Sequence, residues 1–177
     1  MTIASRTLTI ASVCVLTASA FACLIAPIEA ATEFFPLLFW IHIAVIMLGI
    51  LGSLRIRKLK STWSEVWHAF LPIPRTLIIL GIIAAAIAAY STKNVQFDFG
   101  TLPDGTAVHS KNWSESKGRY WLSLNKQPEF EITKVQYQQL QRESHAFFAL
   151  LWLLLSYLIT LQWHYITRRE AQRANAA

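Results

Sequence analysis

The sequence predicts an α-helical membrane protein: a four-transmembrane-helix bundle with a small antiparallel β module in the long loop between spans 3 and 4. Two observations lead to this fold class. Only 15% of the 177 residues are charged, against about 25% in an ordinary soluble domain. All of these charges lie outside four apolar stretches, 7–26, 37–54, 76–91 and 145–166, whose lengths are close to the ~20 residues that a spanning helix needs.

The first stretch, 7–26, has two interpretations. Arg6, an apolar run and Ala18-Ser19-Ala20 resemble a secretory signal peptide, in which case residues 1–20 would be cleaved. We expect the segment to be retained as a span, because apolar residues continue past Ala20.

The two cysteines, Cys14 and Cys23, both lie in this first stretch. Their spacing places them on opposite faces of a helix, so they cannot form a disulfide with each other. This placement also argues against a membrane thiol oxidoreductase, whose chemistry needs cysteines in the exported loops.

The second stretch leads into a basic loop, 55–75, with five basic residues and one acidic residue. Trp63, Val66, Trp67 and Phe70 recur in this loop at helical spacing and predict a short helix lying in the lipid headgroups. The third stretch carries small residues such as Gly81, Ala85 and Ala89. Because small residues allow helices to approach closely, we expect the third span at the centre of the bundle and the bulky fourth span in a groove beside it.

Residues 92–133 form the exported module in this interpretation. The alternation over 95–99 and the segment 119–132 predict strands, and Pro103-Asp104-Gly105 predicts a turn. In the hairpin 119–132, Tyr120, Leu122 and Leu124 share one face, and Phe130 and Ile132 share one face of the returning strand.

A long helix is expected to follow over residues 134–177. Thr133 and Gln136 have the spacing of a capping box, and Ile132 is placed to pack on Tyr137. No Pro or Gly follows, so the helix should run unbroken into span 4. Its first turns, with Tyr137 and Leu140 on one side, should project from the membrane and support the sheet.

The charges also predict the topology. The basic short segments are the N-terminus before span 1, the loop 55–75 within spans 1–3 (residues 1–91) and the tail after Ile166, whereas the loop with Glu29 and Glu33 has no Lys or Arg. Basic segments of this kind stay in the cytoplasm. We therefore expect a bacterial inner-membrane protein with both termini cytoplasmic and loop 92–144 exported. Its net charge of +6 is explained by this topology and by contact with anionic headgroups, so we expect no nucleic-acid partner.

The sequence offers few residues for catalysis. It contains no P-loop, GxSxG, HExxH or CxxC motif and no carboxylate inside a span, so we expect no enzymatic activity and no cofactor. The alternative is a small bis-His haem or metal redox protein, for which His42 and His145 are the candidate ligands.

Several short motifs resemble a loose family of small bacterial four-span membrane proteins. They are Trp40-Ile41-His42-Ile43, Trp67-x4-Leu71-Pro72-x-Pro74, Gly118-Arg119-Tyr120-Trp121-Leu122 and Ile132-Thr133-x3-Tyr137. The resemblance implies an exported G-[KR]-Y-[YW]-L hairpin, although this chain has Asn125-Lys126-Gln127 where members tend to have Asn-His-Gly. The family has no assigned activity, and some small multi-span proteins of this style resemble immunity proteins for membrane-targeted toxins.

These observations together predict a non-enzymatic multi-pass membrane protein whose exported module binds a protein partner, either as an immunity-type protein or as an accessory subunit. The partner-binding residues we expect are Tyr120, Trp121, Phe130 and Tyr137. The lipid bilayer is the other expected partner.

Overall fold

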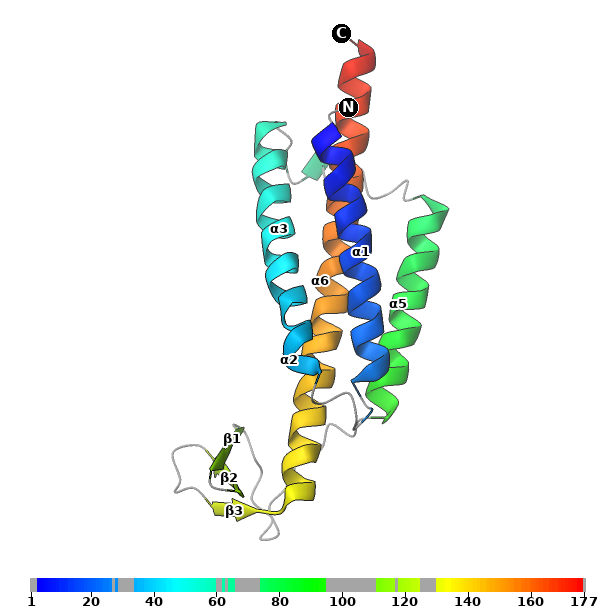
Figure 1. Cartoon of the computed structure of the whole chain (residues 1–177). Coiled ribbons are helices and arrows are strands. Elements are labelled where there is room, and N and C mark those ends of the chain that lie inside the picture. Colours follow the sequence, from blue (N-terminus) through cyan, green and yellow to red (C-terminus); the bar gives the residue numbers. More distant parts are fainter. Residues whose placement is uncertain are drawn as a thin grey trace.

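Four long helices lie side by side in the computed structural model of the chain (Figure 1). They are α1 (Ile3–Ile25), α3 (Trp40–Lys58), α5 (Arg75–Asn94) and α6 (Lys134–Ala176), and the short helix α2 (Phe35–Leu38) precedes α3. The structure describes residues 3–26, 28, 34–59, 62, 64–65, 74–94, 111–116, 118–124 and 130–176. Within these residues, three helical segments are long and apolar enough to cross a membrane, and α5 contains a shorter apolar segment, Arg75–Tyr90. The helical class and the long apolar helices are therefore confirmed.

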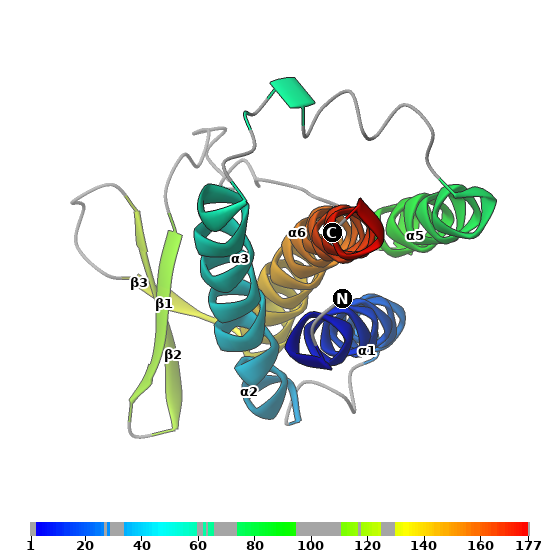
Figure 2. The ribbon, with the colours of Figure 1, turned by 90° about the horizontal axis from the view of Figure 1, so that it is seen from above.

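Helix α6 lies between α3 and α5, with α1 alongside, when the molecule is viewed from above (Figure 2). Each of the other three long helices packs on α6, whereas α5 otherwise packs mainly on α1. The expectation that the third span, now α5, occupies the centre is therefore wrong. The reason is that α6 is not bulky all round: its buried face alternates Trp152 and Trp163 with small residues. The small residues are Ala146, Ala149, Ser156 and Thr160.

The closest helix pair, α1 and α6, meets along a row of buried serines. Ser5, Ser12 and Ser19 are seven residues apart and at most 2% exposed. The Ser12 and Ser19 hydroxyls donate to Thr9 O and Val15 O of their own helix, so they need no partner on α6. Small side chains with internally satisfied hydroxyls let two helices approach closely in lipid.

A three-stranded antiparallel sheet, in the order β1-β2-β3, lies at the other end of α6 from the two chain termini (Figure 1). Its strands are β1 (Lys111–Ser116), β2 (Arg119–Leu124) and β3 (Phe130–Ile132). The pairing of β2 with β3 confirms the expected hairpin. Strand β1 was not expected, because its sequence lacks regular alternation. It pairs with β2 through a two-residue connection that ends in Gly118, whose φ of 74° suits glycine.

The sheet is joined directly to α6 by the predicted capping box. The Gln136 backbone N–H donates to Thr133 Oγ1 (3.2 Å), and the Thr133 N–H donates to Gln136 Oε1 (2.9 Å). Leu122 and Ile132 of the sheet form a small core with Tyr137 and Leu140 of α6. The helix start at Lys134 and the packing of the sheet on the first turns of α6 are therefore confirmed.

Some expectations lie outside the described residues. These are the strand over 95–99, the turn at 103–105, and the predicted headgroup helix at Trp63, Val66, Trp67 and Phe70. They remain predictions.

Candidate functional site

The sheet has two distinct faces, and they divide the four predicted partner-binding residues. Directly opposed residues of an antiparallel pair share a face, and Tyr120 opposes Ile132 whereas Trp121 opposes Glu131. The face that carries Tyr120 packs on α6, and the ring centroids of Tyr120 and Tyr137 lie 4.7 Å apart. Tyr120 and Tyr137, both partly buried, therefore join the sheet to the helix.

Trp121 lies on the opposite face of the sheet, which does not pack on α6. It is half-buried and is opposed by Glu131, whose carboxylate forms an ion pair with Arg119 at 3.8 Å. The Arg119 and Glu131 side chains are 65% and 51% exposed. Phe130 is described only through its backbone, which is paired with Leu122. Only Trp121 among the four residues is thus placed on the outer face.

The Tyr120–Tyr137 contact has an electrostatic consequence. Burial raises the pKa of the Tyr137 hydroxyl above 10.0, and the nearby Glu115 and Tyr120 raise it further. The neutral phenol is therefore the form that this contact favours.

His42 on α3 is held by a tryptophan on α6. The Trp152 Nε1–H donates a hydrogen bond to His42 Nδ1 (3.1 Å), and the His42 ring stacks on Phe39 with centroids 5.2 Å apart. A neutral imidazole that accepts at Nδ1 carries its proton on Nε2. Metal ligation by Nε2 would require the proton to sit on Nδ1 instead, and the hydrogen bond from Trp152 would then be lost.

His145, the second candidate ligand, lies on α6 seven residues before Trp152, or about 10 Å along the helix axis. Because Trp152 is the residue that contacts His42, the two histidines lie at different levels in this structure. Two axial ligands of one haem must approach the same metal. Across the described part of the chain, no group of three or more His, Cys, Asp or Glu residues comes together as a possible metal site.

The two cysteines have different surroundings. Cys14 is exposed and Cys23 is buried among the helices. This agrees with their expected positions on opposite faces of one helix.

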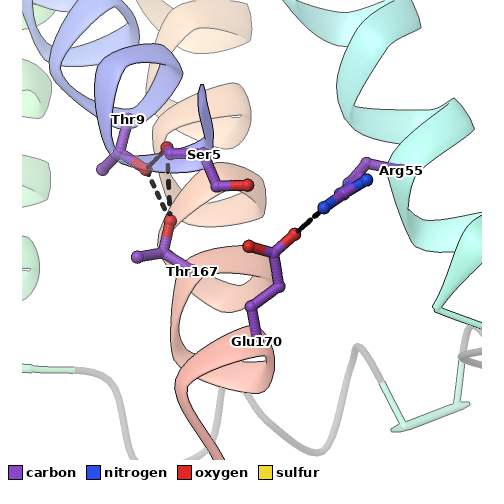
Figure 3. A network of polar contacts seen from close by, with 5 residues as sticks. All are labelled: Ser5, Thr9, Arg55, Thr167 and Glu170. Carbon is purple, nitrogen blue, oxygen red and sulfur yellow. Dashed lines mark hydrogen bonds and ion pairs between the residues drawn. The ribbon is translucent and has the colours of Figure 1, made fainter. Parts of the chain in front are cut away.

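A polar cluster that the sequence reasoning missed lies near the chain termini (Figure 3). The Arg55 Nε on α3 donates to Glu170 Oε1 on α6 at 2.7 Å, and Glu170 is only 7% exposed. Beside this pair, the Thr9 and Thr167 hydroxyls are hydrogen-bonded at 2.8 Å and connect α1 to α6. One signal was available: Glu170 is the only acidic residue after Ile166, which singles it out as a partner for a basic residue on another helix.

Two further polar contacts join α3 to α6 nearby. The buried Trp163 Nε1–H donates to Leu48 O (3.1 Å), and the Arg173 guanidinium donates through Nη2 to Leu59 O (2.6 Å), just after the end of α3. The first contact joins the middle of α3 to α6, and the second joins its end to α6.

Comparison with protein-family models, with curated proteins and with solved structures found no match to this chain.

Proposed function

We propose that this chain is a non-enzymatic, four-span bacterial inner-membrane protein whose exported sheet binds a protein partner through the outer face that carries Trp121. The observation that carries the proposal is the division of the sheet into two faces. One face is used internally on α6, and the other presents Trp121 beside the exposed Arg119 and Glu131 side chains. Trp and Arg are enriched among the residues that dominate binding energy at protein interfaces.

The connection to the membrane helices supports this role. Helix α6 continues without interruption for 43 residues, about 65 Å at 1.5 Å per residue. Hydrocarbon accounts for about 30 Å of this length, so the sheet can be displayed on a rigid support beyond the lipid. A rigid support lowers the entropy that binding would otherwise cost.

The distribution of charge supports the orientation. Both termini and the basic ends of α3 and α6 lie at one end of the molecule, and the sheet lies at the other (Figure 1). By the positive-inside rule the basic end is cytoplasmic. We propose that α5, the third span in chain order, also crosses the membrane, with Arg75 and Tyr90 as anchors at its two interfaces.

A site-specific photo-crosslinker tests the binding face. It would replace Trp121 in one variant and Trp40, which is 70% exposed on α3, in a control. Partner binding predicts a discrete protein adduct from position 121 in native membranes and none of the same mass from position 40. Absence of an adduct at 121, or the same adducts from both positions, would refute the proposal.

The topology is tested separately with two exposed acidic residues. In a background without Cys14 and Cys23, an impermeant maleimide should label Glu115→Cys in intact cells and should not label Glu65→Cys. Labelling of Glu65→Cys alone would invert the topology and place the sheet in the cytoplasm.

The haem alternative has its own readout. An absorbance scan of the protein purified in mild detergent would show a Soret band if haem were bound. If that band were present in the wild type and lost in His42→Phe, the redox function would replace the binding function proposed here.

A further inference from the structure

The end of the molecule that carries the termini has far more positive than negative charge. Within the described residues, the acidic side chains at this end are Glu65 and Glu170. The basic residues there come from all four long helices: Arg6, Arg55, Arg57, Lys58, Arg75, Arg168, Arg169 and Arg173. The carboxylates of the described chain cannot balance them, so the compensating anions must come from outside it.

Both of these carboxylates already have partners. Glu170 is buried and forms the ion pair with Arg55. Glu65 accepts a hydrogen bond from the Thr62 backbone N–H at 3.0 Å. Of the seven other basic residues, five lie on the ends of α3 and α6: Arg57, Lys58, Arg168, Arg169 and Arg173.

Three arginines are gathered at this junction. Arg173 donates to Leu59 O just after the end of α3. Arg55, one turn before Leu59 on α3, pairs with Glu170, three residues before Arg173 on α6. Arg169 is one turn before Arg173 on α6 and shares its face. The Arg169 Nε is buried and has no hydrogen-bond partner among the described residues. A buried donor of this kind favours a site with an acceptor.

The surface next to these arginines is apolar. Leu51 and Leu54, on the α3 turn before Arg55, are 40% and 50% exposed. A ligand that contacts both surfaces must carry an anionic group beside a hydrocarbon chain. This requirement favours a phospholipid over a soluble anion or a nucleic acid.

We propose that the α3–α6 junction binds the phosphate of an anionic phospholipid through Arg169 and Arg173, beside the Arg55–Glu170 ion pair, with an acyl chain along Leu51 and Leu54. Guanidinium groups match phosphate oxygens geometrically and form charge-assisted hydrogen bonds with them. The proposal rests on the proposed membrane insertion, which places the junction at headgroup level, and it deepens the orientation argument by naming a defined lipid site.

The test measures the lipids retained by the full-length protein. The protein would be reconstituted with equal amounts of phosphatidylglycerol and phosphatidylcholine of the same acyl chains, and bound lipid would be counted by native mass spectrometry. We expect enrichment of phosphatidylglycerol in the wild type and a decrease of about fivefold in Arg169→Gln, since a basic residue near a membrane surface contributes about that factor. Lys134→Gln, an exposed basic residue at the sheet end of α6, is the control and should retain the wild-type enrichment.

Arg173→Gln should also lose enrichment, but it removes the contact to Leu59 and so perturbs the fold. Arg169→Gln avoids this problem, and its thermal unfolding should match that of the wild type. Equal retention of both lipids by the wild type, or unchanged enrichment in folded Arg169→Gln, would overturn the proposal. Displacement of phosphatidylglycerol by millimolar inorganic phosphate would also overturn it, in favour of a soluble-phosphate site.

Failure of the proposed function is distinguishable from failure of the lipid site. If carbonate extraction releases the chain from membranes, both proposals are wrong. If the chain resists extraction and retains the two lipids equally, only the lipid site is wrong.

Discussion

Substitution of Gly81 on α5 by alanine tests whether α5 packs on α6 as a fourth helix. A Cβ at Gly81 would lie 2.5 Å from Tyr157 Oη and 2.8 Å from Cζ of the same ring. The Tyr157 hydroxyl donates to Leu77 O at 3.2 Å, so the ring cannot move away without losing that hydrogen bond. By contrast, a Cβ at Gly49 on α3 meets Ile159 at an ordinary 3.5 Å.

The expected magnitude follows from three terms. Overpacking costs about 1–3 kcal/mol, and loss of the hydrogen bond costs about 1 kcal/mol. The higher helix propensity of alanine returns about 1 kcal/mol. Gly81→Ala should therefore lower the free energy of unfolding by about 1–3 kcal/mol, whereas Gly49→Ala should be neutral or slightly stabilising.

The assay is unfolding in mixed micelles with an increasing mole fraction of sodium dodecyl sulfate, followed by circular dichroism. Tyr157→Phe removes the nearest clashing atom, so the double variant Gly81→Ala/Tyr157→Phe should lose less stability than the sum of the two single variants. If Gly81→Ala and Gly49→Ala unfold at the same mole fraction, the close contact of α5 with α6 is not present in the folded protein.

Three further predictions concern the two ends of α6. Glu170→Gln should lower the free energy of unfolding by about 1–2 kcal/mol. This is less than the 3–5 kcal/mol of a fully buried pair, because Arg55 is 34% exposed. If the variant is as stable as the wild type in the same micelle titration, the ion pair contributes nothing to stability. Leu140→Pro should strongly accelerate proteolysis between Gly118 and Lys134, and Thr133→Ala should accelerate it mildly; equal resistance in all three proteins would mean that the sheet folds without α6. The contact of Tyr137 with Tyr120 should stabilise the sheet on α6 below pH 10.0, and this stabilisation should be lost as the pH rises through the raised pKa of Tyr137 in the folded state. High pH should therefore increase proteolysis of the wild type but not of Tyr137→Phe.

The sequence by itself determined the local elements of this protein. Apolar stretches free of charge identify long helices because a charge in hydrocarbon is costly. The capping box at Thr133 and Gln136, the face shared by Tyr120 and Leu122, and the opposite faces of Cys14 and Cys23 depend only on residues close in sequence. Helix and strand periodicity is enough to predict such relations.

The tertiary structure alone decided how the helices are arranged and which residues form the candidate sites. Several helices carry small-residue motifs, so these motifs alone do not show which helices pack together. In the structure the row of buried serines on α1 packs on α6, and the alanine-rich α5 is not the central helix. The Arg55–Glu170 pair and the Trp152–His42 hydrogen bond each join residues more than 100 positions apart. Whether an aromatic residue of the sheet faces α6 or the exterior likewise depends on the docking of the sheet, because strand periodicity defines two faces without saying which one is covered.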